Sequence, residues 1–140
     1  MAEVTAQTKK FQKELNSGTS SLVLLSVLSR SKEAMYGYQI AKLLEESDPD
    51  FPMMKQGTLY PVLRSLEESD PDFPMMKQGT LYPVLRSLEE NGFLESTVEP
   101  SVSGPPRRYY KITSDGRGAL EEWLETWKQT KKFVDAILKG

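Results

Sequence analysis

Apolar residues recur at helical spacing in the first third of the chain. The polar stretch over residues 5–16 contains two apolar residues four positions apart, which favours either a short amphipathic helix that ends at Gly18 or a frayed arm. Residues 20–29 are nearly all apolar and predict a buried helix that Thr19 or Ser20 can cap. This run is too short to cross a lipid bilayer.

A second amphipathic helix is predicted after a polar connection at residues 30–34. It includes the sequence YGYQI and ends near Glu46. The residues of its apolar face are Ile40, Leu43 and Leu44. Residues 47–56 contain two prolines, which excludes a regular helix there.

The next stretch of the sequence occurs twice. Leu44–Glu68 is repeated without change 22 positions later, as Leu66–Glu90. Its core, GTLYPVLRSLEE, predicts an amphipathic helix with Thr80 as the N-cap of the second copy and a proline in the first turn. Only the second copy is followed by Asn91 and Gly92, a pair that typically ends a helix.

The alternation of the sequence after this helix predicts a β-hairpin. Phe93–Val98 and Arg107–Thr113 are expected to be its two strands. The segment from 99 to 106, rich in proline, serine and glycine, is expected to be a long loop between them.

A long amphipathic helix is predicted at the C-terminus, where Ser114 or Asp115 can cap a helix that runs to about Leu138. Its apolar stripe is wide enough to bury against a second copy of the chain. The predicted fold is therefore mainly α with a small β-hairpin wing: a winged helix-turn-helix domain at residues 1–113, followed by a dimerisation helix at residues 114–140.

Composition narrows the possible functions. The chain has neither cysteine nor histidine, which excludes thiolate chemistry, a Ser-His-Asp triad and a histidine metal site. No catalytic constellation remains, and we expect no metal and no cofactor. No secretory signal or membrane-spanning run is present, so a cytoplasmic protein is expected. Because the net charge is −2, any DNA binding must depend on a local basic surface.

Three sequence blocks resemble the PadR-type transcriptional regulators. They are YGYQI at Tyr36–Ile40, GTLYPVLRSLEENGFL at Gly79–Leu94 and GPPRRYYKIT at Gly104–Thr113. The resemblance covers about residues 18–138 and implies a homodimeric repressor that binds double-stranded operator DNA. It also implies that the terminal helix forms the dimer, and that phenolic or drug-like molecules modulate the protein. The inserted 22 residues are not part of the family pattern.

A recognition helix enters the major groove with its N-terminal residues toward the base edges. We therefore expect the second copy to place five residues near DNA: Lys77, Gln78, Thr80, Tyr82 and Arg86. Glutamine suits adenine and arginine suits guanine, whereas hydroxyl groups suit phosphates or bases. For Tyr82, packing against the core is an equal alternative.

Arg107 and Arg108 begin the second strand of the wing. Neighbouring strand residues face opposite ways, so we expect one arginine to reach DNA and the other to pair with a local carboxylate. Tyr109 and Tyr110 should divide in the same way, one toward the core and one outward. Tyr36 could donate a hydrogen bond to a phosphate or pack in the core.

Trp123 and Trp127 lie four residues apart on one face of the last helix. They could form an aromatic wall for a planar ligand between two protomers. They could instead form the core of the dimer, and both roles are compatible.

The two identical copies allow three arrangements. The second copy takes the recognition position and the first is extruded; or the first takes it and the second bridges to the wing; or the first replaces the second helix. In each case the displaced apolar side chains need cover, since leaving one in water forfeits about 1.5–3 kcal/mol. We expect the duplicated protein to stay dimeric but to bind operator DNA poorly. The alternative function is a dimeric sensor of aromatic molecules without effective operator binding.

Overall fold

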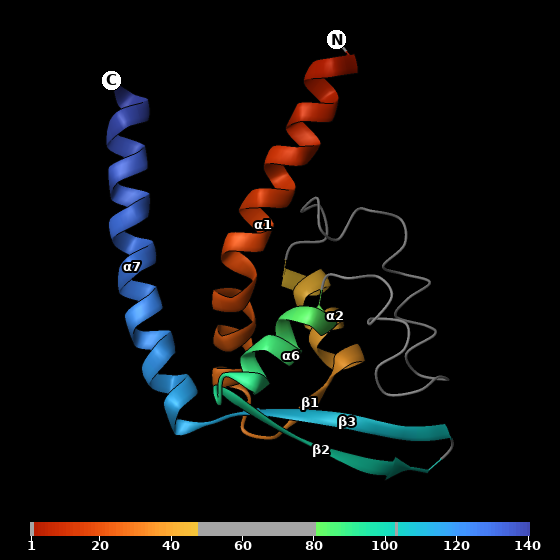
Figure 1. The fold of residues 1–140 in the computed structure, drawn as a ribbon. Helices are drawn as coiled ribbons and strands as arrows, with labels where there is room; N and C mark the ends of the chain where they lie inside the picture. Colours follow the sequence, from red (N-terminus) through yellow and green to blue (C-terminus); the bar gives the residue numbers. More distant parts are fainter. Residues whose placement is uncertain (1, 48–80, 103) are drawn as a thin grey trace.

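The structure is a computed structural model that describes residues 2–47, 81–102 and 104–140. The elements, labelled as in Figure 1, are α1 (Ala2–Arg30), β1 (Met35–Tyr36), α2 (Gly37–Ser47), α6 (Tyr82–Glu90), β2 (Leu94–Ser101), β3 (Gly104–Ile112) and α7 (Ser114–Lys139). Helices dominate, and one antiparallel sheet in the order β1-β3-β2 completes the fold. The predicted class, mainly α with a small wing and a long C-terminal helix, is confirmed.

Helix α1 is continuous, so the predicted break at Gly18 is wrong. Gly18 does not adopt a positive φ. Thr19 Oγ1 donates to the carbonyl oxygen of Leu15 at 2.9 Å, and Ser20 Oγ donates to that of Asn16. Because both hydroxyls bond to the preceding turn of the same helix, neither residue caps a new one.

The sheet has a third strand that the sequence pattern did not predict. The two residues of β1 pair with Tyr110 and Tyr109 of β3, and α2 begins only at Gly37. These residues were expected to lie at the start of the second helix. Their strand pairing depends on residues more than seventy positions away, which no local pattern reveals.

The wing is a longer hairpin than the sequence predicted. Ser101 at the end of β2 pairs with Gly104 at the start of β3, so the long loop expected at 99–106 is wrong. The register shifts between Glu99 and Ser101, where Pro100 lies. A bulge of this kind accommodates a proline, which has no N–H to donate to a neighbouring strand.

Helix α6 comes from the second copy of the repeat. Its N-cap is Leu81, whose side chain makes no capping bond, and Pro83 lies in the first turn as predicted. The predicted cap, Thr80, lies outside the described residues, as does the first copy beyond Ser47.

The end of α6 follows the prediction. Gly92 has a φ of 81°, a conformation in which glycine is unstrained. Its N–H donates to the carbonyl of Glu89 at 3.0 Å, and the N–H of Phe93 donates to that of Leu88 at 2.9 Å. These two bonds form a Schellman motif, which satisfies the last carbonyls of the helix and turns the chain directly into β2.

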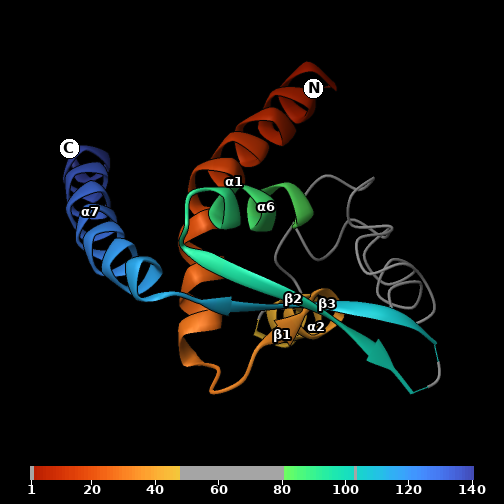
Figure 2. The same ribbon diagram turned by 60° about the horizontal axis from the view of Figure 1, so that its bottom comes forward.

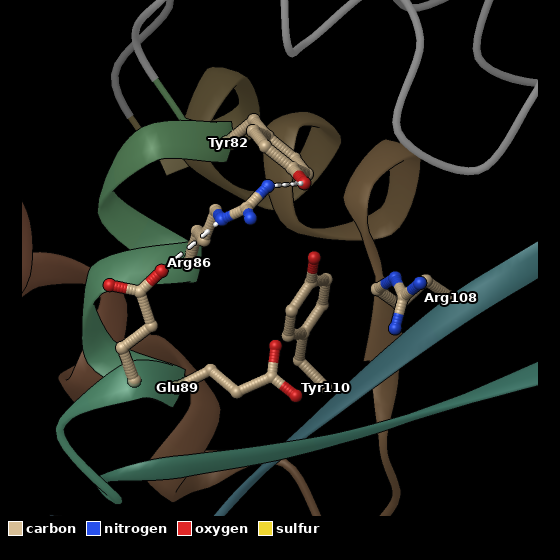
Figure 3. A pocket seen from close by; sticks show the side chains of 6 residues that line it. Tyr82, Arg86, Glu89, Arg108 and Tyr110 are labelled. Carbon is tan, nitrogen blue, oxygen red and sulfur yellow. Dashed lines mark hydrogen bonds and ion pairs between the residues drawn. The ribbon is translucent and has the colours of Figure 1, made fainter.

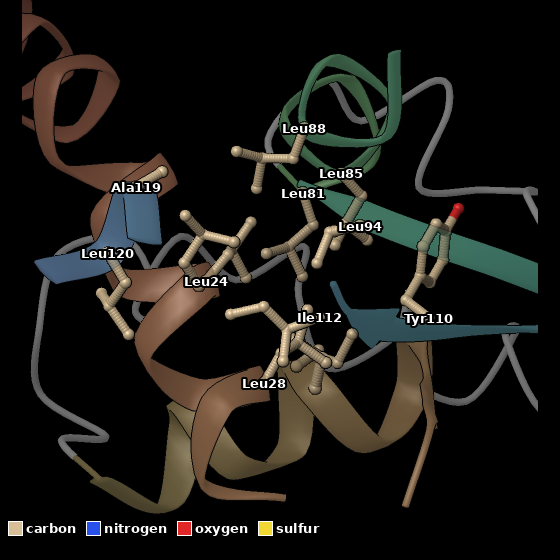
Figure 4. Packing of buried hydrophobic residues seen from close by; sticks show 13 residues of the cluster. Leu24, Leu28, Leu81, Leu85, Leu88, Leu94, Tyr110, Ile112, Ala119 and Leu120 are labelled. Atoms are coloured by element: carbon tan, nitrogen blue, oxygen red, sulfur yellow. The ribbon is translucent and has the colours of Figure 1, made fainter. Parts of the chain in front are cut away.

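One hydrophobic core joins α1, α2, α6, the sheet and the first turns of α7 (Figure 4). Its buried residues are Leu24, Leu25, Leu28, Ile40, Ala41, Leu81, Leu85, Leu88, Leu94, Tyr110, Ile112, Ala119 and Leu120. Three of these leucines belong to the second copy of the repeat. In the described part of the chain, the second copy therefore supplies the helix beside the wing.

Helix α7 is attached to the end of α6 through its cap. The cap is Thr113, and not Ser114 or Asp115 as predicted. Its hydroxyl accepts from the N–H of Gly116 at 3.0 Å and donates to the carbonyl of Gly92 at 2.6 Å.

Beyond the core, the outer halves of α7 and α1 extend on the same side of the molecule (Figures 1 and 2). No helix among the described residues is long and apolar enough to span a membrane.

Candidate nucleic-acid interface

The exposed side of α6 carries one arginine held between two residues of its own helix. Arg86 Nη1 donates to the hydroxyl of Tyr82 at 3.0 Å, and Arg86 Nε donates to Glu90 Oε1 at 3.2 Å. The bond with Tyr82, and then that with Glu90, raises the pKa of Arg86 above its ordinary value. A fixed positive charge is therefore presented on the helix surface.

Tyr82 takes one of the two roles between which the sequence did not decide, packing against the core, and its contact with DNA stays a prediction. Its ring is half-buried and packs against the core cluster, while its hydroxyl accepts the bond from Arg86. The other three residues expected near DNA on this helix, Lys77, Gln78 and Thr80, lie outside the described residues.

A cleft of about 300 Å³ lies between α6 and the wing (Figure 3). Its lining residues are Tyr82, Arg86, Glu89, Glu90, Arg108 and Tyr110. The cleft brings an arginine of the helix and an arginine of the wing to the same side of the molecule.

Glu89 connects the helix to both strands of the wing. Ser96 Oγ on β2 donates to Glu89 Oε2 at 2.5 Å, and Arg108 Nη1 on β3 donates to Ser96 Oγ at 3.2 Å. The carboxylate expected beside one wing arginine therefore exists, but a serine hydroxyl stands between the two. Neither Ser96 nor Glu89 stands out in the sequence, because only the turn of the chain at Gly92 brings them together.

The two wing arginines lie on opposite faces of β3, as the alternation predicted. Arg108 lines the cleft with Tyr110, whose side chain is only 3% exposed and belongs to the core. Arg107 lies on the other face, with its guanidinium carbon 4.5 Å from the ring centroid of Tyr36. Tyr109 is half-buried on that face, so the predicted division of the two tyrosines is confirmed.

Tyr36 is the centre of a small aromatic cluster. Its ring centroid lies 5.4 Å from that of Tyr109 and 6.1 Å from that of Tyr38, which stacks on it at 17°. Arg107 covers the cluster, and its Nε is buried without a hydrogen-bond partner among the described residues. A guanidinium over an aromatic face is stabilised by the ring quadrupole. Tyr36 therefore supports an arginine, a role that was not among the two expected for it, a hydrogen bond to a phosphate and packing in the core.

Trp123 and Trp127 have different surroundings within one protomer. Trp123 is half-buried and meets Phe93 edge to face, with centroids 5.5 Å apart and an interplanar angle of 86°. Trp127 is 42% exposed. The two residues therefore do not enclose a ligand site within a single chain.

The outer parts of α7 and α1 expose many large apolar side chains. On α7 they are Leu124, Trp127, Phe133, Val134, Ile137 and Leu138. On α1 they are Val4, Phe11, Leu15 and Val23.

Among the described residues, no group of three or more metal-ligating side chains exists.

Comparison with known proteins gives a family. The sequence profile of the transcriptional regulator PadR-like family matches residues 24–71 and 72–122, which together are well over half of the chain. Each matched stretch contains one copy of the repeated GTLYPVLRSLEE. An uncharacterized protein of Lysinibacillus sphaericus is 28% identical over 120 residues, which cover 86% of this chain and 87% of that protein.

Solved structures of similar fold point the same way. A PadR family transcriptional regulator from Eggerthella lenta is 27% identical, with a TM-score of 0.66 over 99% of this chain and 97% of that one. A PadR family transcription regulator from Clostridium difficile is 25% identical, with a TM-score of 0.56 over 86% and 98%. A transcriptional regulator from Clostridium thermocellum, at 24% identity and a TM-score of 0.63 over 87% and 95%, shares the fold.

Proposed function

Because this chain belongs to the transcriptional regulator PadR-like family, we propose that it is a repressor that binds operator DNA as a homodimer. The family consists of transcriptional regulators and not of enzymes, which confirms both the resemblance and the expectation of a non-enzyme. The proposal adds the repressor role, the homodimer and the residues that contact DNA.

The observation that carries this proposal is the shared cleft of α6 and the wing. Arg86 from the helix and Arg108 from β3 both line it. Since the whole chain has a net charge of −2, DNA binding needs a local basic surface, and we assign Arg86, Arg107 and Arg108 to it. Glu89 and Glu90 line the same cleft, so the positive charges of its two arginines are partly offset.

We assign the DNA contacts from the chemistry of each side chain. Arg86 contacts a guanine edge in the major groove, because a guanidinium suits the O6 and N7 acceptors. Arg107 and Arg108 contact the phosphate backbone from the two faces of the wing strand. Tyr36 orients Arg107 through its ring, which lies 4.5 Å from the guanidinium. Lys77, Gln78 and Thr80 complete the contacts at the N-terminal side of α6.

The proposed dimer uses the exposed apolar residues of α7. Trp127, Val134 and Ile137 are between 42% and 64% exposed in the single chain. A helix surface of this kind is stabilised by burial at about 25 cal/mol per Å². Two-fold pairing with a second copy covers it, since each copy presents the same surface to the other.

A second function, sensing a planar aromatic molecule, is favoured by Trp127. A large indole ring left partly exposed beside the dimer surface provides a face on which such a ligand can stack. This site, if formed between protomers, also includes Trp123. Quenching of tryptophan fluorescence by a phenolic acid in wild type, and its loss in Trp127→Leu, tests this function separately from DNA binding.

The proposed function is tested with DNA duplexes selected by the protein from a random library. Fluorescence anisotropy should give at least about a thousandfold tighter binding to the selected duplex than to its scrambled version. Affinity should fall steeply between about 50 and 200 mM salt, since contacts with phosphates release counterions. Equal affinity for both duplexes at every salt concentration would reject operator binding and leave the sensor function.

A further inference from the structure

The contact between α6 and the outer part of the wing is polar. The apolar core reaches β2 at Leu94, which is 2% exposed. Beyond Ser96, the described residues Thr97, Val98 and Glu99 are all exposed. Ser96 is therefore the position along β2 where burial stops supporting the strand, and it is there that the bond to Glu89 is made.

The placement of Glu89 is not explained by the stability of its own helix. A carboxylate in the last turn lies near the negative end of the helix dipole, which is unfavourable. Glu89 is only half-exposed, so its charge also loses part of its hydration. The bond from Ser96 at 2.5 Å compensates for this loss, and Arg108 polarises the same hydroxyl by donating to it at 3.2 Å.

The two hydrogen bonds that join Arg108 to Ser96 and Ser96 to Glu89 thus connect three elements. Figure 3 shows the Glu89 side chain reaching from α6 across the cleft toward the sheet. The partners lie 7 and 12 residues apart in sequence, on a helix and on the two strands of the wing. A hydrogen bond to a charged group is directional and about twice as strong as a neutral one. It therefore sets a definite separation between the helix and the wing.

We propose that Ser96 and Glu89 are positioning residues for DNA recognition, which hold the wing at the distance from α6 that lets both bind one duplex together. This inference rests on the proposed DNA-binding function. A recognition helix and a wing contact different parts of the duplex, so a change in their separation forfeits one set of contacts. Neither residue needs to touch DNA itself.

The first experiment uses no DNA. The chain contains no cysteine, so Ser87→Cys on α6 and Val102→Cys at the wing tip accept two spin labels cleanly. Both positions are exposed. Labelled protein is diluted with unlabelled protein so that only distances within one chain are measured. Double electron–electron resonance then gives the distance distribution between the two labels.

Three variants separate positioning from simple stability. Ser96→Ala removes the bridging hydroxyl, so the distance distribution between the two labels should broaden. The substitution leaves every charge in place. Ser96→Thr restores a hydroxyl and should retain the narrow distribution. Thr97→Ala deletes the hydroxyl of the neighbouring, exposed residue of β2 and should behave as wild type. Thermal unfolding of each variant reports any loss of stability.

The second experiment measures the affinity ratio between the selected and the scrambled duplex. In Ser96→Ala this ratio should fall about tenfold, as expected for one lost bond to a charged group. Binding to the scrambled duplex should be unchanged, because no charge is removed. Ser96→Thr and Thr97→Ala should keep the wild-type ratio.

Two results would overturn the inference: an unchanged distance distribution in Ser96→Ala, or a broadened distribution with an unchanged affinity ratio. If the wild type does not discriminate between duplexes, the proposed function fails instead. The distance distribution still decides whether Ser96 positions the wing in that case.

Discussion

Arg86 donates from its Nε to Glu90 Oε1 at 3.2 Å, one turn farther along the same helix. Both side chains are largely exposed, at 60% and 68%. Exposed pairs at this spacing are screened by solvent and stabilise a helix only weakly. Glu90 therefore adds little to the stability of the fold. Its carboxylate nevertheless binds the guanidinium of Arg86, which we assign to base recognition.

Replacing Glu90 with glutamine should strengthen DNA binding. The change frees Arg86 from an intrahelical carboxylate and removes a negative charge that repels phosphate. We expect an affinity for the selected duplex about threefold higher at low salt, with the gain shrinking as salt rises. Glu68→Gln, the same change in the first copy of the repeat, should have no such effect. Weaker binding by Glu90→Gln would contradict the assigned role of Arg86.

The repeat provides a matched test of which copy reads DNA. Arg64 and Arg86 occupy the same position of an identical 25-residue sequence. Arg86→Ala should weaken binding to the selected duplex by about 10- to 100-fold, the cost of a lost bidentate base contact. Arg64→Ala should leave it within about twofold of wild type. The reverse outcome would assign recognition to the first copy.

Deletion of residues 47–68 removes one copy of the repeat and leaves the other with its Asn91-Gly92 ending. We expect the shortened protein to remain folded, because the core residues at 81, 85 and 88 are retained. Its affinity for the selected duplex should rise at least about tenfold if the additional copy disturbs the recognition helices. Equal affinities at matched salt would show that the duplication does not impair binding.

Alanine substitutions at two glycines of α7 should have opposite effects on the free energy of unfolding. A Cβ at Gly116 would lie 2.2 Å from the carbonyl oxygen of Phe93 and 2.7 Å from Ile112 Cγ1, whereas one at Gly118 would meet nothing within 4 Å. Gly116→Ala should therefore lower the free energy of unfolding by about 3 kcal/mol, through forced movement of backbone. Gly118→Ala should raise it by about 0.5–1 kcal/mol, through helix propensity. Denaturant unfolding checks both, and a neutral Gly116→Ala would contradict the close contact of α7 with the end of α6.

The dimer is tested on the exposed apolar face of α7. Val134 is 43% exposed in the single chain, and Val134→Glu would bury a carboxylate twice in a two-fold interface. We expect the dimer dissociation constant to rise by about a hundredfold or more, measured by sedimentation equilibrium. Ala136→Glu, on the opposite side of the same helix, should leave it unchanged. Dissociation of both variants to the same extent would point to another interface.

Several features of the fold were readable from sequence because they depend on neighbouring residues. The apolar face of α6, its proline in the first turn and the stop at Gly92 follow from local periodicity and local backbone preference. The opposite placement of Arg107 and Arg108 follows from the two-residue period of a strand. The three sequence blocks likewise indicated the family.

Other features depended on residues far apart in the chain. The strand β1 exists because Met35 and Tyr36 find Tyr110 and Tyr109 as partners. The wing extends to Ser101 because β3 supplies a pairing edge as far as Gly104. In both cases a short segment with no strong preference of its own takes the conformation that satisfies its backbone hydrogen bonds.

The repeat shows both what neighbouring residues determine and what contacts between distant residues determine. Its two copies are identical, so the sequence determined that either could form an amphipathic helix, and only Asn91 and Gly92 distinguished them. The tertiary structure decided that the helix at Tyr82–Glu90 packs on the core with Glu89 facing the wing. The physical reason is that the bond between Glu89 and Ser96 requires the chain to reverse at Gly92, and side-chain periodicity alone carries no information about that approach.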